Sequence, residues 1–188
     1  SRSISPIIPQ TRPVITNIKY FSTSKYAIDI IAAKTNPSDE IVLVNNAGGA
    51  LGKEPIQDGA IEDWDTMIDT NVKGLLYVTK VLLPIMCKNQ KGHIVNLCSI
   101  AGKQVYSEGN VYCAAKHAVD AISKGIRIDA LPYNVKVTNI CPGAVETEFS
   151  IVRFHGDTEK AAAMRQPKSA LIRRFLPSSW CADNAHRC

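Results

Sequence analysis

The chain has 188 residues, of which 45% are hydrophobic and 21% are charged, a composition typical of one globular domain. No stretch approaches the roughly 20 uninterrupted apolar residues of a membrane-spanning helix, so a spanning segment is excluded. The net charge of +5 comes from the two ends, because residues 29–159 hold more acidic than basic side chains. That distribution argues against a nucleic-acid-binding groove, which needs basic residues patterned on the folded core.

The two ends differ in composition from the middle of the chain. Residues 1–28 are rich in Ser, Thr, Pro and Arg, contain no acid, and resemble a mitochondrial presequence. The alternative, a disordered leader without a targeting role, is the favoured interpretation. Residues 164–188 are basic and aperiodic, which predicts a weakly structured tail. Residues 29–163 are therefore expected to form the folded part.

The six cysteines form no C-x-x-C pair and none lies near a histidine at a metal-ligand spacing. No metal site is predicted, and reduced, buried thiols are the preferred interpretation. Reduced thiols favour a reducing compartment. We therefore expect a cytoplasmic protein, with a mitochondrial location as the alternative that the acid-free leader leaves open.

Apolar patterns predict alternating strands and helices in the middle of the chain. Short β-branched runs indicate strands near 41–45, 93–98 and 135–140, and helical spacing indicates helices near 62–88 and 111–131. A proline at position 84 is expected to bend or end the first helix. This alternation predicts a parallel sheet with right-handed crossovers. Ligands then belong at the carboxyl ends of the strands, where Asn46, Ser99 and Pro142 follow.

Tyr112 and Lys116 are four residues apart on a predicted helix and therefore share a face. An ammonium beside a phenol stabilises the phenolate and lowers the tyrosine pKa towards neutrality, which makes the tyrosine a usable acid and base. Taken alone, this spacing is common by chance. A surface lysine beside a half-buried tyrosine is the ordinary alternative.

Several pieces of sequence occur in the order and near the spacing of one known family. They are Asn45-Asn46-Ala47-Gly48, Asn71 within Asp69–Gly74, Ser99, Tyr112-Cys113-Ala114-Ala115-Lys116, and Pro142-Gly143 with Thr147. With these pieces the chain resembles the short-chain dehydrogenase/reductases over about residues 40–163. The resemblance implies an α/β fold, a Rossmann-like doubly wound parallel sheet.

Flanking segments narrow the resemblance to one branch of the family. The segments are Ala50-Leu51-Gly52, Glu62-Asp63-Trp64, Gly109-Asn110-Val111 and Glu146–Phe154. They are similar to NADP-dependent serine and allo-threonine 3-dehydrogenases, which oxidise 3-hydroxy acids. The resemblance implies NADP, with NAD possible, and a small-molecule substrate, with neither nucleic acid nor membrane as a partner. Family members are homo-oligomers, which is less expected of a truncated chain.

The resemblance also implies roles for individual residues. Tyr112 would be the general acid/base, Lys116 would lower its pKa and bind the nicotinamide ribose, and Ser99 would hydrogen-bond the substrate oxygen. Asn71 would hold a water that links Lys116 to solvent, although a polar residue on a helix face is the plainer interpretation of Asn71. Arg153 is a candidate for a substrate carboxylate, since guanidinium pairs with it bidentately. A solvated surface arginine is an equally good interpretation.

Cofactor binding is assigned by resemblance to a second set of residues, which follow predicted strands or lie on the Tyr112 helix. They are Asn46, Ala47, Gly48, Tyr112, Lys116, Pro142, Gly143, Val145 and Thr147. Ser99, Tyr112 and Arg153 would contact the substrate. For the residues that follow strands, ordinary turns that satisfy backbone groups are the alternative.

The chain departs from the family at its front end. Family members carry a glycine-rich turn after their first strand that receives the cofactor pyrophosphate, but this sequence has no glycine before Gly48. The amino-terminal βαβ half is therefore expected to be truncated or replaced. Two hypotheses follow: an NADP-dependent dehydrogenase of small 3-hydroxy acids, or a catalytically inactive fragment with at most a binding role.

Overall fold

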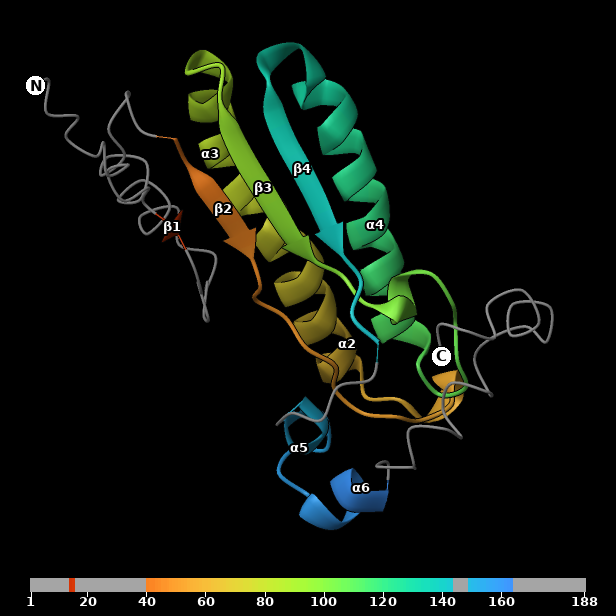
Figure 1. Ribbon diagram of the computed structural model, residues 1–188. Helices are drawn as coiled ribbons and strands as arrows, with labels where there is room; N and C mark the ends of the chain where they lie inside the picture. Colours follow the sequence, from red (N-terminus) through yellow and green to blue (C-terminus); the bar gives the residue numbers. More distant parts are fainter. Residues whose placement is uncertain (1–13, 16–39, 144–148, 164–188) are drawn as a thin grey trace, which may run out of the picture. The chain divides into compact units, whose positions relative to one another are not determined.

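The computed structural model describes residues 14–15, 40–143 and 149–163 (Figure 1). The chain divides into two compact units, and each is described by itself. The first, called the sheet unit, contains residues 1–47, 73–97 and 120–140. The second, called the loop unit, contains residues 48–72, 98–119 and 141–188. Among the described residues, no helix is long and apolar enough to cross a membrane.

The sheet unit is built on four parallel strands in the order β1-β2-β3-β4. Their bounds are Val14–Ile15 for β1, Val42–Asn45 for β2, Gly92–Leu97 for β3 and Val135–Ile140 for β4. The last three match the predicted strands within one residue, which confirms the parallel α/β architecture. The two-residue strand β1 was not predicted. It pairs with β2 in the register Val14↔Val42.

Two helices cover one face of this sheet, α3 (Gly74–Lys88) and α4 (Asn110–Ala130), whose second half belongs to the sheet unit (Figure 1). A row of asparagines shows that both helices lie on the same face. Asn45 donates to Thr79 of α3 at 3.3 Å and to Asn96 at 2.8 Å, and Asn96 donates to Ser123 of α4 at 2.9 Å. Successive right-handed crossovers in one direction produce this arrangement, as in the second half of a doubly wound sheet.

The predicted helix at 62–88 is interrupted. It consists of α2 (Ile61–Ile68), a π-helical turn (Asp69–Lys73) and α3. The helix does not end at Pro84, which lies inside α3 and is followed by four more helical residues to Lys88. Near the carboxyl end of a helix the missing proline N–H removes one hydrogen bond, and the packing of the buried Leu82 and Met86 holds the turn.

The loop unit contains α2, the first half of α4, α5 (Phe149–Arg153) and α6 (Thr158–Ala163). Its described core is small. Ala50, Met67, Ala101, Tyr112 and Cys113 are buried together, and Leu51, Trp64, Tyr106, Val111 and Phe149 pack against them. Short 3-10 turns at Ile56–Asp58 and Ile100–Gly102 connect these pieces. The unit is therefore made largely of segments that follow strands.

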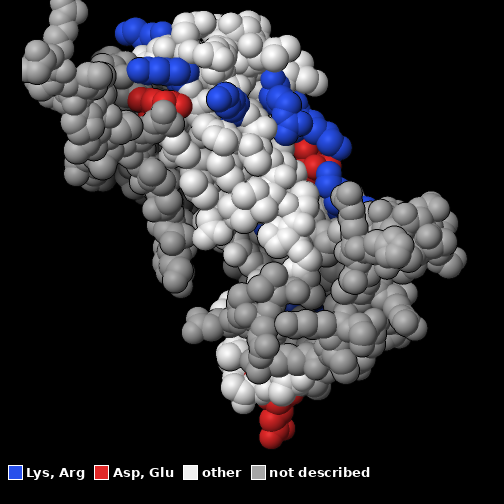
Figure 2. Space-filling model, in the orientation of Figure 1, with Lys and Arg blue, Asp and Glu red and all other residues white. Residues whose placement is uncertain are grey.

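Charged side chains are unevenly placed on the face that Figure 2 shows. Lys and Arg gather toward one end of this face, with Asp and Glu among them, and a broad area of the described surface carries no charged side chain. A continuous basic stripe is not visible among the described residues of this face. The area without charge lies over the later parts of β2, β3 and β4, the strands that face the viewer in Figure 1, whereas Lys136 near the start of β4 is exposed.

Candidate active site

Ser99 follows the end of β3 and opens a tight turn. Its backbone is extended, with φ −174°, and its hydroxyl accepts a hydrogen bond from the Ala101 amide at 3.1 Å, as a helix-capping serine does. The next amide, Ile100 N, donates to Pro142 O at 2.9 Å. Ser99 is thus held by its own turn and by the segment that follows β4.

Tyr112 and Lys116 lie on the first two turns of α4, in the loop unit, and both side chains are buried, at 7% and 6% exposure. The Ser99 side chain hydrogen-bonds the Tyr112 hydroxyl. Lys116 Nζ lies 5.9 Å from the centroid of the Tyr112 ring. The structure therefore brings together Ser99, Tyr112 and Lys116, the three residues that the sequence analysis selected as catalytic candidates.

Burial dominates the electrostatics of this group. It raises the pKa of Tyr112 to about 12, because the phenolate loses solvation, and the hydrogen bond from Ser99 only partly offsets this by lowering the pKa. The sequence predicted a Tyr112 pKa lowered by Lys116, and the structure shows the opposite direction. Burial also lowers the pKa of Lys116, while the thiols of Cys98 and Cys141 raise it. Both shifts favour the neutral forms of the two side chains.

Asn71 lies in the π-helical turn and is 2% exposed. Its Nδ2 donates to Gly49 O at 2.9 Å and to Met67 O at 2.8 Å, so the side chain fastens the 48–49 turn to the helix. Its Oδ1 is buried without a hydrogen-bond partner among the described residues. Single π-turns inside helices occur frequently at functional sites. Here the π-turn places an unpaired acceptor beside Gly48.

Arg153, the last residue of α5, is buried at 2% exposure, which excludes the solvated arginine considered from the sequence. Its Nε donates to Gly52 O at 2.7 Å and its Nη1 donates to the Tyr106 hydroxyl at 2.9 Å. The guanidinium carbon lies 5.7 Å from the Tyr106 ring centroid and 5.9 Å from that of Tyr112. Within the described part of the chain, no carboxylate forms a salt bridge with this buried cation.

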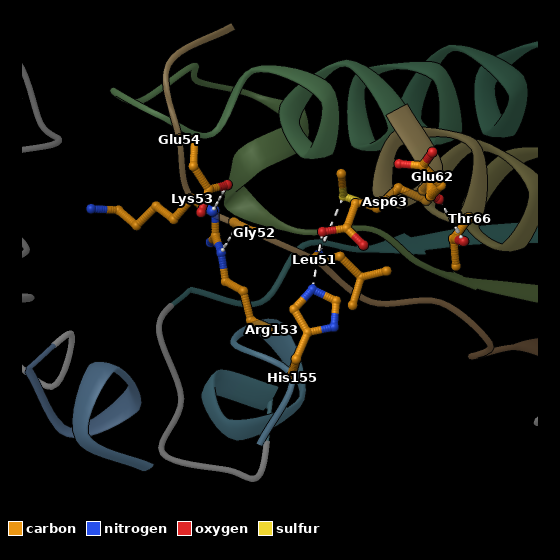
Figure 3. A network of polar contacts seen from close by, with 10 residues as sticks. Leu51, Gly52, Lys53, Glu54, Glu62, Asp63, Thr66, Arg153 and His155 are labelled. Carbon is orange, nitrogen blue, oxygen red and sulfur yellow. Dashed lines mark hydrogen bonds and ion pairs between the residues drawn. The ribbon is translucent and has the colours of Figure 1, made fainter. Parts of the chain in front are cut away.

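The segment around Arg153 is tied to the 51–63 segment at two points, shown in Figure 3. Besides the side-chain bond, Gly52 N donates to Arg153 O at 2.9 Å, and His155 Nε2 lies 3.0 Å from Asp63 Oδ2. A small hollow beside this junction is lined by residues that include Trp64, Met67, Tyr112 and Arg153. Arg153 and Tyr112 therefore share the wall of one hollow within the loop unit.

The predicted cofactor residues that follow strands lie in surface turns. Asn46, Ala47 and Gly48 are exposed directly after β2, and Gly143 is exposed two residues after Cys141. Gly48 has φ +135°, a conformation open to glycine, and a Cβ there would meet Asn71 Oδ1. A Cβ at Gly143 would have no atom of a described residue within 4 Å, so as far as the described residues go the backbone there is open to a ligand. Val145 and Thr147 lie outside the described residues.

These observations fit one end of a nicotinamide dinucleotide. Within the loop unit, exposed backbone at Gly48 and Gly143 permits close approach of a flat ring, while Tyr112 and Lys116 offer a buried hydroxyl and ammonium. A pyrophosphate needs a glycine-rich turn at a helix amino terminus. The described residues contain no such turn.

Sequence reasoning missed Tyr106 and Gly52, which orient the Arg153 guanidinium. Both lie in irregular segments, where no periodic pattern reveals which side chain points inward. The π-turn around Asn71 was missed as well. The spacing of the buried positions Met67, Asn71 and Leu75 gave no signal of it, because positions four apart also lie on one face of a regular α-helix.

The sequence of this chain is similar to proteins whose family agrees with the geometry of the Ser99, Tyr112 and Lys116 group. The family model described as short chain dehydrogenase matches residues 10–157, which extends the likeness thirty residues upstream of the segment recognised from motifs. The NADP-dependent 3-hydroxy acid dehydrogenase YdfG of Salmonella typhi is 52% identical over 131 residues, covering 69% of this chain and 53% of that protein. The NADP-dependent 3-hydroxy acid dehydrogenase of Schizosaccharomyces pombe is 40% identical over 155 residues, covering 73% and 60%.

A solved structure described as the closed form of serine dehydrogenase complexed with NADP+ matches with a TM-score of 0.72. It is 46% identical, and the match covers 77% of this chain and 60% of that one. The chain spans about half the length of the Salmonella relative. Because the family model matches well over half of the sequence, this chain belongs to the short-chain dehydrogenase family.

Proposed function

We propose that this chain carries the catalytic half of an NADP-dependent dehydrogenase that oxidises a small 3-hydroxy acid. The observation that carries the proposal is the hydrogen bond between Ser99 and Tyr112, with buried Lys116 one turn further along the same helix. The names of the bacterial and yeast relatives support the cofactor and the substrate class. NAD is a possible second cofactor, because the part that distinguishes the two cofactors in the family precedes residue 40.

Tyr112 is the proposed general base in alcohol oxidation. Its phenolate takes the proton of the substrate hydroxyl, and Ser99 donates a hydrogen bond to the same oxygen as negative charge develops there. Because burial raises the pKa of Tyr112, phenolate formation needs a nearby positive charge. The Lys116 ammonium, on the same helix face, supplies that charge. NADP, when bound, accepts the hydride and contributes a further positive charge on its ring.

Arg153 is the proposed partner of the substrate carboxylate. Its guanidinium is buried, and it donates hydrogen bonds to two neutral oxygens, those of Gly52 and Tyr106. A buried cation without a nearby anion is unfavourable, and an incoming carboxylate corrects this while accepting two parallel hydrogen bonds. The position of its guanidinium over the Tyr112 ring supports this role, because a short hydroxy acid requires a carboxylate partner near the reacting hydroxyl.

Asn71 has a proposed part in proton exchange. Its buried, unpaired Oδ1 is an acceptor suited to a bound water, and such a water would link Lys116 to solvent. Asn46, Ala47, Gly48, Pro142, Gly143, Val145 and Thr147 are proposed to line the nicotinamide pocket. Support for this comes from the exposed turns after β2 and β4 and from the absence of a Cβ at positions 48 and 143.

Cofactor binding and turnover test the proposal together. NADPH fluorescence is titrated with the present chain and with a restored chain, in which the front end and tail of the Salmonella relative flank residues 40–163. Both are assayed with L-serine, L-allo-threonine and 3-hydroxyisobutyrate, using NADP and NAD. We expect the restored chain to turn over and the present chain to bind NADPH weakly, because the pyrophosphate anchor positions the nicotinamide.

The inactive-fragment alternative has its own signature in this experiment. If the restored chain also fails to bind NADPH and shows no turnover, the dehydrogenase proposal is wrong. If the restored chain turns over while the present chain neither binds NADPH nor turns over, residues 40–163 carry a competent site and the present chain by itself is the inactive fragment of the alternative.

A further inference from the structure

Two cysteines occupy neighbouring positions where β3 and β4 end. The last register pair of these parallel strands is Leu97↔Ile140, so the next residue on each strand is a cysteine, Cys98 and Cys141. Ile100, three residues after Leu97, donates its N–H to the carbonyl of Pro142, two residues after Ile140, at 2.9 Å, so the two segments stay adjacent. Neighbouring strands are about 4.8 Å apart. A disulfide requires Cα atoms roughly 4.4–6.8 Å apart, which this spacing satisfies.

The two side chains also point to the same face of the sheet. Side chains alternate along a strand, so Cys98 shares the face of Asn96, and Cys141 shares the face of Asn139. Asn96 donates to Ser123 at 2.9 Å and Asn139 donates to Asp120 at 2.8 Å, both on α4. Cys98 and Cys141 therefore both face the turn of α4 that precedes these residues.

Interactions of Lys116 with both cysteines independently indicate that the two sulfurs lie at the turn of α4 that carries Lys116. Cys98 Sγ donates to Lys116 O at 3.2 Å. Electrostatic interactions with Cys98 and with Cys141 both raise the pKa of Lys116 against the lowering by burial. Lys116 therefore lies close to both sulfurs.

We propose that Cys98 and Cys141 form a redox pair that closes to a disulfide when the protein meets a hydroperoxide. Both are thiols in this structure, Cys98 buried and Cys141 partly exposed. The Cys141 thiolate attacks a peroxide oxygen, the O–O bond breaks, and a sulfenic acid and water or an alcohol form. Cys98 then attacks that sulfur, the S–O bond breaks, and water leaves. Two thiols lose two electrons and two protons, and the peroxide is reduced.

This pair is a modification site beside the proposed catalytic lysine, and its formation does not depend on cofactor or substrate. Closing the disulfide removes the Cys98 S–H that donates to the Lys116 carbonyl, so it changes a contact of the helix turn that carries Lys116. The remaining described cysteines do not offer this arrangement. Cys87 lies in α3, and Cys113 is buried beside Tyr112.

Peptide mapping of the full chain tests the pair directly. The protein is treated with hydrogen peroxide, remaining thiols are alkylated, and the chain is digested with trypsin without reduction. We expect peptide 92–103 linked to peptide 137–153, with a mass two hydrogens below their sum and parallel loss of both alkylated forms. The link should reverse with dithiothreitol. It should persist in Cys87→Ser and disappear in Cys98→Ser and Cys141→Ser.

The same treatment in denaturant is the control for geometry, because an unfolded chain has no reason to prefer this pair among its six cysteines. Native protein should give the 98–141 link severalfold more often than denatured protein. Equal yields in both states, or full alkylation of Cys98 and Cys141 after peroxide, would overturn the proposal. Neither result depends on whether the chain is a dehydrogenase.

Discussion

Buried polar groups are used differently in the two units. In the sheet unit, the buried or partly buried polar groups Asn45, Asn96, Thr79 and Ser123 are neutral, and their hydrogen bonds to one another join the four elements β2, β3, α3 and α4. In the loop unit, the buried groups include the cations of Lys116 and Arg153, and Arg153 is matched by neutral oxygens. A neutral network that satisfies itself stabilises a fold. For Arg153, which has no carboxylate partner among the described residues, a buried charge is unfavourable for folding, and this supports the proposal that it serves a ligand.

Among the predictions, replacing Lys116 should have the largest effect on turnover, and it tests whether a buried charge in the loop unit serves catalysis and not folding. Lys116→Met removes a buried charge, so the restored chain should lose about 10²- to 10⁴-fold in turnover while its stability to urea stays the same or rises. Lys124→Met is the matched control, since Lys124 is exposed on the same helix and pairs with Asp120 at 2.8 Å. A Lys116 variant that unfolds without losing specific activity would show a structural role instead.

Arg153 offers the next largest effect, on substrate recognition. Charged hydrogen bonds contribute about 1.5–3 kcal/mol, so Arg153→Met should raise KM for a 3-hydroxy acid by about 10- to 100-fold. The methyl ester of the same substrate lacks the carboxylate and serves as the control. Initial rates with acid and ester, and a urea transition for each protein, separate recognition from folding. Equal effects on acid and ester would mean that Arg153 only holds Gly52 and Tyr106 in place.

Adjacent glycines provide a test of the turn that Asn71 fastens. An alanine at Gly48 meets Asn71 Oδ1 and must adopt φ +135°, so Gly48→Ala should destabilise the chain by about 2 kcal/mol. Gly49→Ala is the matched control, because no atom lies within 4 Å of its Cβ position. It should be neutral to slightly stabilising. Urea midpoints compare the two, and equal losses would show that the turn tolerates no side chain at either glycine.

The smallest effect is a pH dependence of stability. The Tyr112 pKa is 10.0 in an ordinary setting and about 12 here, so the folded chain holds the proton longer than the unfolded chain. That stability is complete below pH 10 and is lost as pH rises towards 12, by about 1 kcal/mol at pH 11. Urea unfolding from pH 9 to 11 measures the slope. Tyr112→Phe should remove the contribution of Tyr112 to the slope of unfolding free energy against pH. A slope that Tyr112→Phe leaves unchanged would mean that Tyr112 is not buried.

Sequence patterns predicted strands β2, β3 and β4, and patterns together with the family resemblance singled out Ser99, Tyr112 and Lys116, for identifiable reasons. Each strand is a short β-branched run with a polar end, and the spacing of Tyr112 and Lys116 fixes their common face whatever surrounds them. The carboxyl ends of parallel strands meet at one edge, which is why Ser99 could be placed. These are local or topological properties, and a single sequence carries them.

Other features depend on contacts between segments far apart in the chain. The burial of Arg153 and its bonds to Gly52 and Tyr106 join positions about 50 and 100 residues apart, with no periodicity to predict them. The raised pKa of Tyr112 reflects the depth of burial, which a spacing rule does not contain. The π-turn depends on packing around Asn71. Pro84 was tolerated because the surrounding helix is packed, which propensity alone does not foresee.

The central claim is that Ser99, Tyr112 and Lys116 form a reaction site. The most direct measurement is the single-turnover rate of NADP reduction by the restored chain with Tyr112→Phe, beside Tyr133→Phe, whose tyrosine is 41% exposed. We predict a loss of about 10²- to 10⁴-fold for Tyr112→Phe, since general acid–base catalysis contributes that much, and no loss for Tyr133→Phe. A Tyr112→Phe protein that is folded, binds NADP and retains its rate would contradict the account.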